Sequence, residues 1–396
     1  MGNVVFDLSL WQIIAWIGMA VASWFSLTCA YSAWDFFGRR RSEDLPSPDW
    51  MPAVTMLKPL KGLDPQLYEN LSTFCRQEYP RFQIVFGVAD RQDPAVAVVR
   101  TLQREHPTLD IELIVDGRLY GTNDKVSNLI NMYRRAKHDV LVLSDGDIRV
   151  PPDYLQRVVA PLRNERIGLV TCMYRAVAAH SDLPTLLWCT TINALLTPQI
   201  LGARKVEKPT YAFGATLALR RSTLEAIHGF EEIANMLADD YQLGNRIAAH
   251  GLQLWLSECV VDTVLALASW RQLFHHLLRR ARTNRSHRPL GYFFTVLTQG
   301  LLWAIVNVVA GGFGVLALSA SLLTIGIRLT TVAFVGRRGL RARLTMADVF
   351  LVLLTDLLQM PVWVGGFLGN SVWWSGRRFR VLKSGEMQAL PVTSSP

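Results

Sequence analysis

The amino-acid sequence predicts an α/β domain with a mostly parallel sheet, attached to membrane helices on both its N-terminal and C-terminal sides. Two observations support this prediction. Short apolar segments alternate with amphipathic ones between residues 52 and 286, and long uncharged apolar segments lie on either side of that region. Alternation of strand and helix is typical of βαβ units, whose strands run parallel.

The N-terminal membrane segment covers residues 8–34, none of which is charged. It is longer than the roughly 20 residues that a helix needs to cross the hydrocarbon core. We expect it to stay as an anchor, because the preceding residues contain no Lys or Arg and no small-residue cleavage site follows.

The C-terminal membrane region is expected over residues 290–374. Residues 290–327 are uncharged and long enough for two crossings, with Gly311 and Gly312 as the turn and 329–335 completing the second. A third stretch, 346–374, contains Asp348, Asp356 and Pro361. These residues argue against a straight lipid-facing helix, so this stretch either spans or re-enters. The tail at 384–396 is predicted to be disordered.

The net charge of +9 comes largely from clusters beside the apolar segments, at 39–41, 337–343 and 377–383. Such placement predicts contact with anionic lipids and a cytoplasmic domain between the membrane regions, and it argues against nucleic-acid binding. The five cysteines lack metal-binding spacing, which indicates a reducing compartment, no structural metal and simple burial.

Within the domain, four strands and three helices are expected in alternation. The strands are 53–57, 83–88, 111–115 and 139–144, and the helices are 65–76, 94–105 and 124–137. Asp64 and Asp93 each precede a proline, a pattern typical of helix starts. Ligands of parallel sheets gather at the carboxyl ends of the strands, so residues there are the first candidates for chemistry.

Lys58 ends the first strand, and Asp90 and Asp93 follow the second. A carboxylate at that place can accept hydrogen bonds from a base or a ribose, although Asp93 would look the same as a simple helix cap. Asp145 and Asp147 follow the fourth strand. Carboxylates at this spacing can hold one divalent cation, and the cation can hold a diphosphate. Asp-Gly-Asp is also an ordinary turn, but its place after a βαβ strand favours the metal site.

Three further segments carry candidate residues. Lys125, Asn128 and Asn131 share a helix face that could reach phosphates or order the Asp145 loop. The alternative is a solvated face, which suits Asn131 better than Lys125. Asp239 and Asp240 open a helix, where they could stabilise its dipole or act as a general base. The arginine-rich segment 270–286 could lie at the membrane interface or stabilise a departing diphosphate.

Several motifs in order resemble the ceramide glucosyltransferase family of inverting transferases. They are KPLKGLDPQLYENL, VADRQDPA, SDGDIRVPPDYL, GATLALRRSTL and LADDY, within residues 50–290. Within that family, YENL, IVFGVAD, GTNDKVSNLINM and ADDY resemble the bacterial hopanoid-biosynthesis-associated glycosyltransferases. The resemblance implies an A-type glycosyltransferase fold, Rossmann-like, over residues 50–289.

The resemblance also implies residue roles. The family's donor aspartates fall on Asp93 and Asp145, with Asp90 placed to hold a uridine and Lys58 and Lys125 beside the donor. Asp147 completes a Mg²⁺ or Mn²⁺ pair with Asp145. Two further residues take part in the transfer step itself. Asp240 is the general base, and Arg279 is the arginine of the family's closing motif. The family's closing motif has Gln or Arg, two residues, Arg and Trp. Here it reads His-Leu-Leu-Arg-Arg at 276–280, which keeps the arginine and departs at both ends.

The activity implied is transfer of N-acetylglucosamine or glucose from a UDP-sugar to a lipid hydroxyl. The resemblance also implies a multi-pass protein of the bacterial inner membrane, with its catalytic domain in the cytoplasm. The preferred acceptor is a hopanoid such as bacteriohopanetetrol, and ceramide is the alternative. The acceptor is expected to enter near 183–201 and the arginine-rich helix. A polyprenyl-phosphate glycosyltransferase and a non-catalytic lipid-binding protein are further alternatives. A processive polysaccharide synthase is disfavoured because too few spans remain for a channel.

Overall fold

The computed structural model describes residues 9–38, 50–382 and 384–390, and it separates into two compact units. The sheet unit consists of Arg39–Thr185, Lys208–Trp270 and Asn370–Pro396. The helical unit consists of Met1–Gly38, Leu186–Glu207 and Arg271–Gly369. The arginine-rich segment from Arg271 onward therefore groups with the helical unit, and not with the α/β domain in which the sequence placed it.

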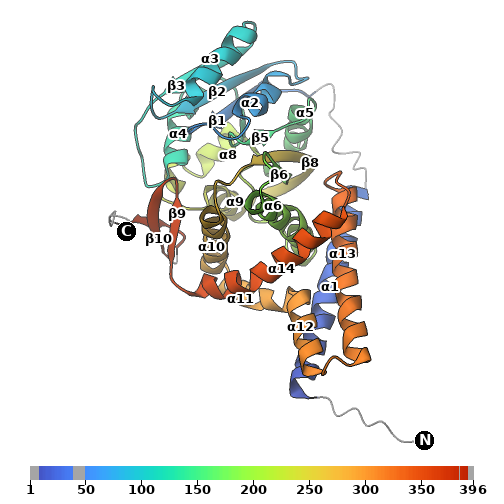
Figure 1. The fold of residues 1–396 in the computed structure, drawn as a ribbon. Coiled ribbons are helices and arrows are strands. Elements are labelled where there is room, and N and C mark those ends of the chain that lie inside the picture. The colour runs from blue at the N-terminus through green and yellow to red at the C-terminus, as the bar shows by residue number, and fades with distance from the viewer. Residues whose placement is uncertain (1–8, 39–49, 383, 391–396) are drawn as a thin grey trace, which may run out of the picture. The chain divides into compact units, whose positions relative to one another are not determined.

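The sheet unit contains an eight-stranded sheet in the order β3-β2-β1-β4-β7-β6-β8-β5 (Figure 1). The four predicted strands form one parallel half: β1 (Val54–Pro59), β2 (Phe82–Val88), β3 (Asp110–Val115) and β4 (Val140–Leu143). The other half is mixed, with β7 (Leu217–Arg220) antiparallel to β4 and to β6 (Ile167–Ala178). Next in this half, β8 (Gln253–Leu265) runs parallel to β6 and antiparallel to the edge strand β5 (Ile148–Arg149). The predicted α/β fold with a mostly parallel sheet is confirmed.

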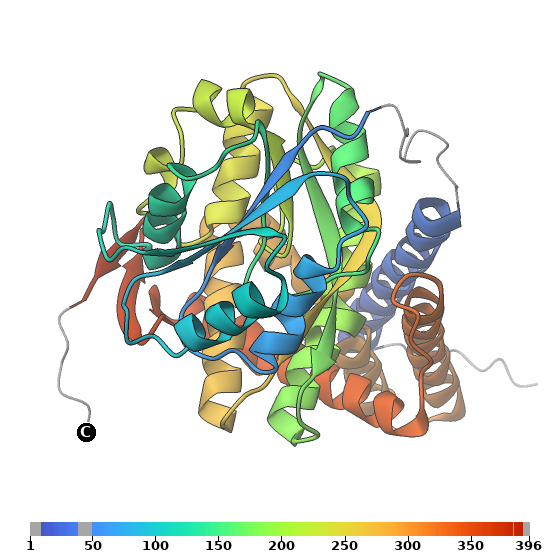
Figure 2. The same cartoon turned by 90° about the horizontal axis from the view of Figure 1, so that it is seen from above.

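Alternating side chains of the strands pack into two hydrophobic cores, one on each face of the sheet. Met56 and Val142 pack into one core, and their neighbours Leu57 and Leu141 pack into the other. This follows from the two-residue period of a strand. Helices α2 (Leu67–Cys75), α3 (Ala95–Glu105) and α5 (Tyr154–Val159) cover the first face. Helices α4 (Asp124–Tyr133), α8 (Arg221–Ala226) and α9 (Asp239–Ala249) cover the second (Figure 2).

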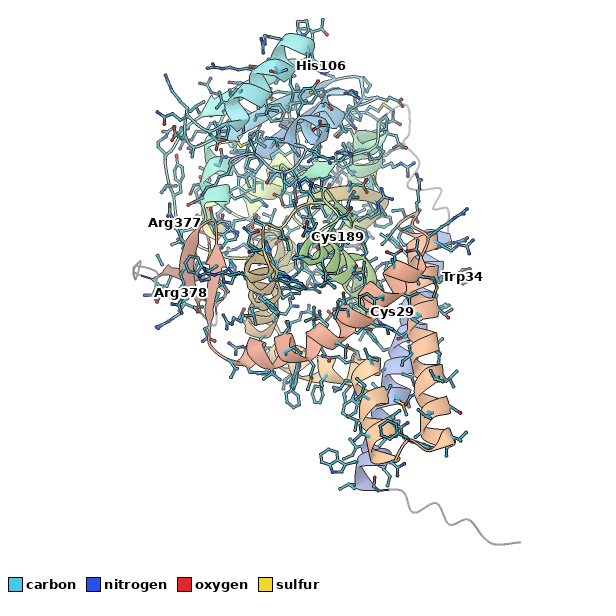
Figure 3. The ribbon with its side chains drawn as sticks, in the orientation of Figure 1. Cys29, Trp34, His106, Cys189, Arg377 and Arg378 are labelled. Carbon is cyan, nitrogen blue, oxygen red and sulfur yellow. The ribbon has the colours of Figure 1, made fainter. Side chains whose placement is uncertain are left out.

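The C-terminal part of the sheet unit is an added three-stranded sheet, in the order β11-β10-β9. It consists of β9 (Ser371–Trp374), β10 (Arg377–Val381) and β11 (Met387–Ala389). Figure 3 shows Arg377 and Arg378 on β10. Two expectations are therefore wrong: residues 371–374 are not part of a membrane helix, and residues 387–389 are not disordered. Strand pairing with β10 and burial of Met387 order the short segment.

In the part of the chain that the structure describes, four helices are long and apolar enough to cross a membrane, by length and composition. They are α1 (Leu10–Gly38), the helical run Leu183–Val206, α13 (Val315–Arg338) and α14 (Met346–Phe367). The run Leu183–Val206 combines α6 (Leu183–Thr190), η3 (Thr191–Leu196) and α7 (Thr197–Val206), and the sequence did not predict it as a crossing. The helices expected on both sides of the α/β domain are thus present.

A bent helix pair precedes α13. It joins Pro289–Thr298 to α12 (Gly300–Ala310) with a bend of 54°, and can count as a fifth span. The pair contains α11 (Pro289–Phe294) and η5 (Thr295–Thr298). The chain then turns at the predicted glycines, where Gly312 has a φ of 58°. Helix α10 (Trp270–His287) precedes this pair.

Helix α14 is continuous although it contains Pro361. The two carboxylates that argued against it both have partners. Asp348 forms a capping box with Thr345 at the first turn, and Asp356 pairs with Arg328 of α13 at 3.0 Å. All five cysteines are buried, as predicted, and Figure 3 shows Cys29 and Cys189 on separate helices.

Candidate active site

Lys58 supports the loop that follows β4. Its side chain is 0% exposed, and its Nζ donates to Ser144 Oγ at 3.2 Å and to the carbonyl oxygen of Asp145. The ammonium also lies 3.7 Å from the centre of the Phe74 ring. Burial lowers the pKa of Lys58 to about 7, although nearby carboxylates oppose that shift. The predicted donor contact is not supported, because nothing of this side chain reaches the surface.

The Asp145 loop joins β4 to β5 and gathers three carboxylates. Asp147 Oδ2 accepts a hydrogen bond from Thr263 Oγ1 at 2.7 Å, and its carbonyl accepts from Val264 N at 2.9 Å. A Cβ added to Gly146 would lie 2.7 Å from Asp64 Oδ2, so a larger residue here would displace that carboxylate. Burial, and then the charge of Asp145, raise the pKa of Asp147 to about 7. The same two causes raise the pKa of Asp64.

These raised pKa values fit a site for a divalent cation, because a cation would relieve the repulsion between Asp145 and Asp147. Within the described residues, no group of three or more His, Cys, Asp or Glu side chains could hold a metal ion by itself. Mg²⁺ is often held by one or two carboxylates together with substrate phosphates. The pair therefore suits a cation that arrives with a diphosphate.

Lys125 connects this loop to the start of α9. Its Nζ lies 2.7 Å from Asp145 Oδ1 and 3.1 Å from Asp239 Oδ2. Burial alone would lower the pKa of Lys125, but Asp145, Asp239 and Asp240 together raise it, so this lysine stays charged. It lies in the first turn of α4, where Asn123 caps the helix by accepting from Val126 N at 3.1 Å.

The other two polar residues on this face of α4 are buried, so the solvated alternative is wrong for both. Asn128 and Asn131 are 8% and 3% exposed. Asn128 Nδ2 donates to the Gly87 carbonyl at 2.8 Å, and Asn131 Nδ2 donates to the carbonyls of Asp116 and Arg118. Asn131 thus satisfies carbonyls that follow the end of β3, and Asn128 adds a second donor to the Gly87 carbonyl of β2, which also accepts from Leu60 N at 2.8 Å. These amides hold α4, and with it Lys125, against the strand ends.

Asp240 is anchored by two backbone amides. Its Oδ2 accepts from Gly214 N at 2.7 Å and its Oδ1 accepts from Tyr241 N at 2.8 Å. Burial, and then Asp239, raise its pKa to about 6, while Lys125 and the two amides oppose the shift. Neither acidic residue is the cap of α9, because that position belongs to Ala238.

Gly214 marks the place where these groups converge. A Cβ added there would lie 3.1 Å from Asp145 Oδ2, 3.3 Å from Lys125 Nζ and 3.5 Å from Asp240 Oδ2. The carboxylate of the proposed metal pair and the carboxylate proposed as base are thus neighbours across one glycine, although they lie far apart in the sequence.

An aromatic cluster flanks Gly214 and Asp240. Tyr211 stacks on Tyr241 with an interplanar angle of 13°, and Phe213 contacts both Tyr211 and Tyr174 edge to face. Such half-buried rings can pack against the apolar face of a sugar or a lipid. Sequence reasoning missed this cluster, although the YAFG segment beside Gly214 contained the signal.

The segment before α9 is fixed from two sides. Asn123 Nδ2 donates to the Met236 carbonyl at 2.8 Å, which ties the segment to α4. On the other side, Met387 N donates to the Asn235 carbonyl at 2.8 Å and Leu237 N donates to the Gly385 carbonyl at 3.2 Å. The three-stranded C-terminal sheet therefore helps to place Asp239 and Asp240.

Two other candidates in the sheet unit, Asp90 and Asp93, lie outside this convergence. Asp93 accepts from Gly62 N at 2.9 Å and from Ala95 N at 2.9 Å, so it ties the loop after β1 to the start of α3, whose cap position belongs to Pro94. Asp90 is exposed and accepts from Gln92 N at 2.9 Å, so it has surface available for a ligand. Arg279 belongs to the helical unit, where its Nη2 lies 3.4 Å from His276 Nδ1. Its catalytic role stays a prediction.

Two further members of the site, Asp64 and Thr263, were not predicted. Asp64 was noted only as a helix start, but it follows β1 closely enough to reach the Asp145 loop. Thr263 carries no sequence signal, because it reaches Asp147 only through the pairing of β5 with β8.

Comparison with known proteins identifies the family. Residues 14–387, most of the chain, match the sequence profile of glycosyl transferase family 21. The chain belongs to glycosyl transferase family 21. This confirms the prediction that the chain belongs to a glycosyltransferase family similar to the ceramide glucosyltransferases.

Curated relatives of this family 21 chain include ceramide glucosyltransferases. The ceramide glucosyltransferase 1 of Caenorhabditis elegans is 28% identical over 213 residues, which cover 52% of this chain and 44% of the relative. The chain thus spans less than half the length of that relative. The ceramide glucosyltransferase of Komagataella phaffii is 23% identical over an alignment of 444 residues, covering 87% of this chain and 85% of the relative.

The fold also has a solved counterpart. The mannosyltransferase PcManGT from Pyrobaculum calidifontis, solved with GDP-Man and Mn²⁺, superposes with a TM-score of 0.53 at 18% identity. The match covers 91% of this chain and 98% of that one. It confirms the predicted A-type glycosyltransferase fold.

Proposed function

We propose that this chain transfers a sugar from a nucleoside-diphosphate sugar to a hydroxyl group of a membrane lipid, with inversion at the anomeric carbon. The observation that carries the proposal is the convergence at Gly214 of Asp145, Lys125 and Asp240. A donor-binding carboxylate, a fixed cation and a carboxylate with a raised pKa are the groups that displacement of a diphosphate requires.

Asp145 and Asp147 would hold Mg²⁺ or Mn²⁺, which neutralises charge on the donor diphosphate. The mannosyltransferase with the same fold was solved with Mn²⁺, and the carboxylate pair in this chain fits such a cation. Asp90 is the exposed carboxylate available to the nucleoside, and Asp93 shapes the adjacent loop. Lys125 keeps the Asp145 side chain oriented, because it bonds Asp145 directly and is itself held by Asp239.

Asp240 acts as the general base. As the lipid oxygen bonds to the anomeric carbon, the bond from that carbon to the diphosphate oxygen breaks, and the hydroxyl proton passes to Asp240. The amides of Gly214 and Tyr241 fix the carboxylate in place, while burial raises its pKa enough to accept a proton. General-base assistance contributes about 10²–10⁴-fold.

The donor is UDP-N-acetylglucosamine or UDP-glucose, and the preferred acceptor is a hopanoid polyol such as bacteriohopanetetrol. The hopanoid assignment rests on the GTNDKVSNLINM and ADDY motifs. Ceramide is the alternative, favoured by the names of the curated relatives. The enzyme would lie in the bacterial inner membrane with the sheet unit in the cytoplasm and anionic lipids around it, because arginine clusters border the apolar helices.

The test combines binding and product analysis. Asp147→Ala should abolish Mn²⁺-dependent binding of UDP, measured by calorimetry on purified protein, while the protein remains folded. Asp153→Ala is the matched control, because the Asp153 carboxylate pairs with Arg157 on the exposed side of α5. Unchanged Mn²⁺-dependent affinity in Asp147→Ala would overturn the metal site. Mass spectrometry of lipids from cells with and without the gene then identifies the sugar and the acceptor.

A further inference from the structure

The hairpin of β9 and β10 in the sheet unit has a tight tip. Ser375 and Gly376 form its two-residue turn, with φ values of 51° and 77°. Positive φ at both central residues is typical of the type I′ turn, whose twist matches that of the flanking strands. Figures 1 and 2 both show the hairpin beside α4, and the tip is in hydrogen-bond contact with Asp124, the first residue of that helix.

At this tip, two cations gather around one carboxylate. Asp124 Oδ2 lies 3.0 Å from Lys61 Nζ and accepts from Ser375 Oγ at 3.4 Å. Lys61 Nζ also donates to Ser375 Oγ, and Arg377 Nη1 lies 4.0 Å from Asp124 Oδ1. The two cations outnumber the carboxylate that they share, so this cluster carries a net positive charge.

The cluster adjoins the residues proposed to bind the donor. The amide of Gly62, in the loop after β1, donates to Asp93 at 2.9 Å. Asp124 immediately precedes Lys125, whose Nζ lies 2.7 Å from Asp145 Oδ1. The loop after β1 and the start of α4 both follow parallel strands, at the edge of the sheet where ligands gather. The cluster therefore lies at the same edge as the proposed donor site.

Strand alternation determines which arginine of β10 faces this edge. Phe379 is buried in the cluster that contains Leu237, just before the start of α9. Arg377 lies two residues from Phe379 and so shares its face of the strand, whereas Arg378 lies on the opposite face. There Arg378 is exposed and donates to Ser371 Oγ at 3.2 Å.

The two cations are accessible to a ligand. The side chains of Lys61 and Arg377 are 62% and 55% exposed, whereas that of Asp124 is 19% exposed. Exposed ion pairs contribute little to stability, so a stronger anion can replace Asp124 as the partner of both cations. A diphosphate carries more negative charge than one carboxylate, and the planar guanidinium of arginine can donate two parallel hydrogen bonds to phosphate oxygens.

We infer that Arg377 and Lys61 bind the diphosphate of the nucleoside-diphosphate sugar, so that the C-terminal hairpin is part of the donor site. In the free protein Asp124 holds the two cations at the edge of the site, and the diphosphate replaces it when the donor binds. The inference rests on the proposed function, because it takes a nucleotide sugar as the donor. It gives Arg377 a role other than the lipid contact predicted for residues 377–383, and it leaves that prediction to Arg378 and Arg380.

The experiment measures the binding of UDP with Mn²⁺ by calorimetry, on full-length protein in phosphatidylcholine nanodiscs. Arg377→Gln and Lys61→Gln should each weaken binding about tenfold, the lower end of the range for a hydrogen bond to a charged group. Arg378→Gln is the matched control, because it removes the same charge from the opposite face of the same strand, and it should bind UDP normally. Unchanged affinity in either Arg377→Gln or Lys61→Gln, or an equal loss in Arg378→Gln, would overturn the inference.

Asp124→Asn separates donor binding from a structural role of the cluster. The amide keeps the size of the side chain and can still accept from Ser375, but it no longer competes with the diphosphate as an anion. UDP should therefore bind at least as tightly as it does to the wild-type protein. A cluster that only holds the hairpin in place predicts the opposite, a loss of affinity equal to that of Arg377→Gln, and that result would reject a direct contact with the donor.

Two further comparisons identify the source of the phosphate and separate this inference from the proposed function. If Arg377→Gln weakens UDP binding only in nanodiscs that contain phosphatidylglycerol, Arg377 serves lipid phosphate and the inference is wrong. If the wild-type protein does not bind UDP with Mn²⁺, the proposed function fails and the inference fails with it. If the wild-type protein binds UDP and transfers sugar while Arg377→Gln matches it in both, the proposed function stands and only the inference fails.

Discussion

The sheet unit and the helical unit both bury charged side chains, but they balance the charges in opposite ways. In the helical unit one cation, Arg328, meets one carboxylate, Asp356, in a two-bond pair. In the sheet unit the buried carboxylates outnumber the two buried lysines. Lys125 is surrounded by Asp145, Asp239 and Asp240, and Lys58 lies near Asp145, Asp147 and Asp64. A balanced pair is complete as it stands, and an excess of carboxylates is suited to bind a cation or accept a proton.

The largest expected effect removes the proton acceptor of the unbalanced cluster. Asp240→Asn keeps the shape of the side chain and can still accept from the Gly214 amide, but it cannot take a proton from a hydroxyl. Transfer should fall about 10²–10⁴-fold, the usual contribution of a general base. Turnover of UDP-sugar into glycolipid is the measurement, with UDP binding as the control that should not change. Transfer within a few-fold of wild type would remove Asp240 as the base.

Breaking the balanced pair should affect stability and not chemistry. Arg328→Leu leaves Asp356 buried without its cation, which typically costs about 3–5 kcal/mol. Replacing both residues, Arg328→Leu with Asp356→Leu, should recover much of that loss because no unpaired charge remains. Thermal unfolding in detergent measures both effects. A double variant as unstable as the single one would mean that the pair does more than balance charge.

The pH dependence of transfer should report the unbalanced cluster. Asp240 has a raised pKa of about 6, caused first by burial, so it binds its proton at a higher pH than an ordinary aspartate. The active, ionised form is present above that pH and is lost as the pH falls through it. Transfer should therefore fall about tenfold per pH unit below about 6. Rate profiles at saturating substrate test this, and Asp240→Asn should lack the inflection.

The contrast between the units also explains what the sequence could predict. Strand and helix alternation and the runs of uncharged residues are local patterns, and they located β1 to β4, α1 and the turn at Gly312. Asp145, Asp147 and Asp240 stood out because each follows a strand or opens a helix. The burial of Lys58, the contact of Thr263 with Asp147 and the order of β11 depend on distant strand pairing. No local pattern carries that information.

The smallest effect is expected from Asp239, the neighbour of the proposed base. Its carboxylate lies 3.1 Å from Lys125 Nζ, so its role is to help position the lysine that bonds Asp145. Asp239→Asn removes one charge but leaves an amide oxygen that can still accept from Lys125, and Lys125 keeps Asp145 as its closer partner at 2.7 Å. Losing the charged form of one hydrogen bond is worth about 1 kcal/mol, or roughly fivefold in rate. The loss should appear mainly as weaker UDP binding, since Lys125 orients the Asp145 carboxylate that is proposed to bind the donor. The pH inflection near 6 should also shift downward, because the charge of Asp239 helps to raise the pKa of Asp240. Equal losses of turnover in Asp239→Asn and Asp240→Asn, with the inflection unmoved, would mean that the two carboxylates only stabilise the start of α9.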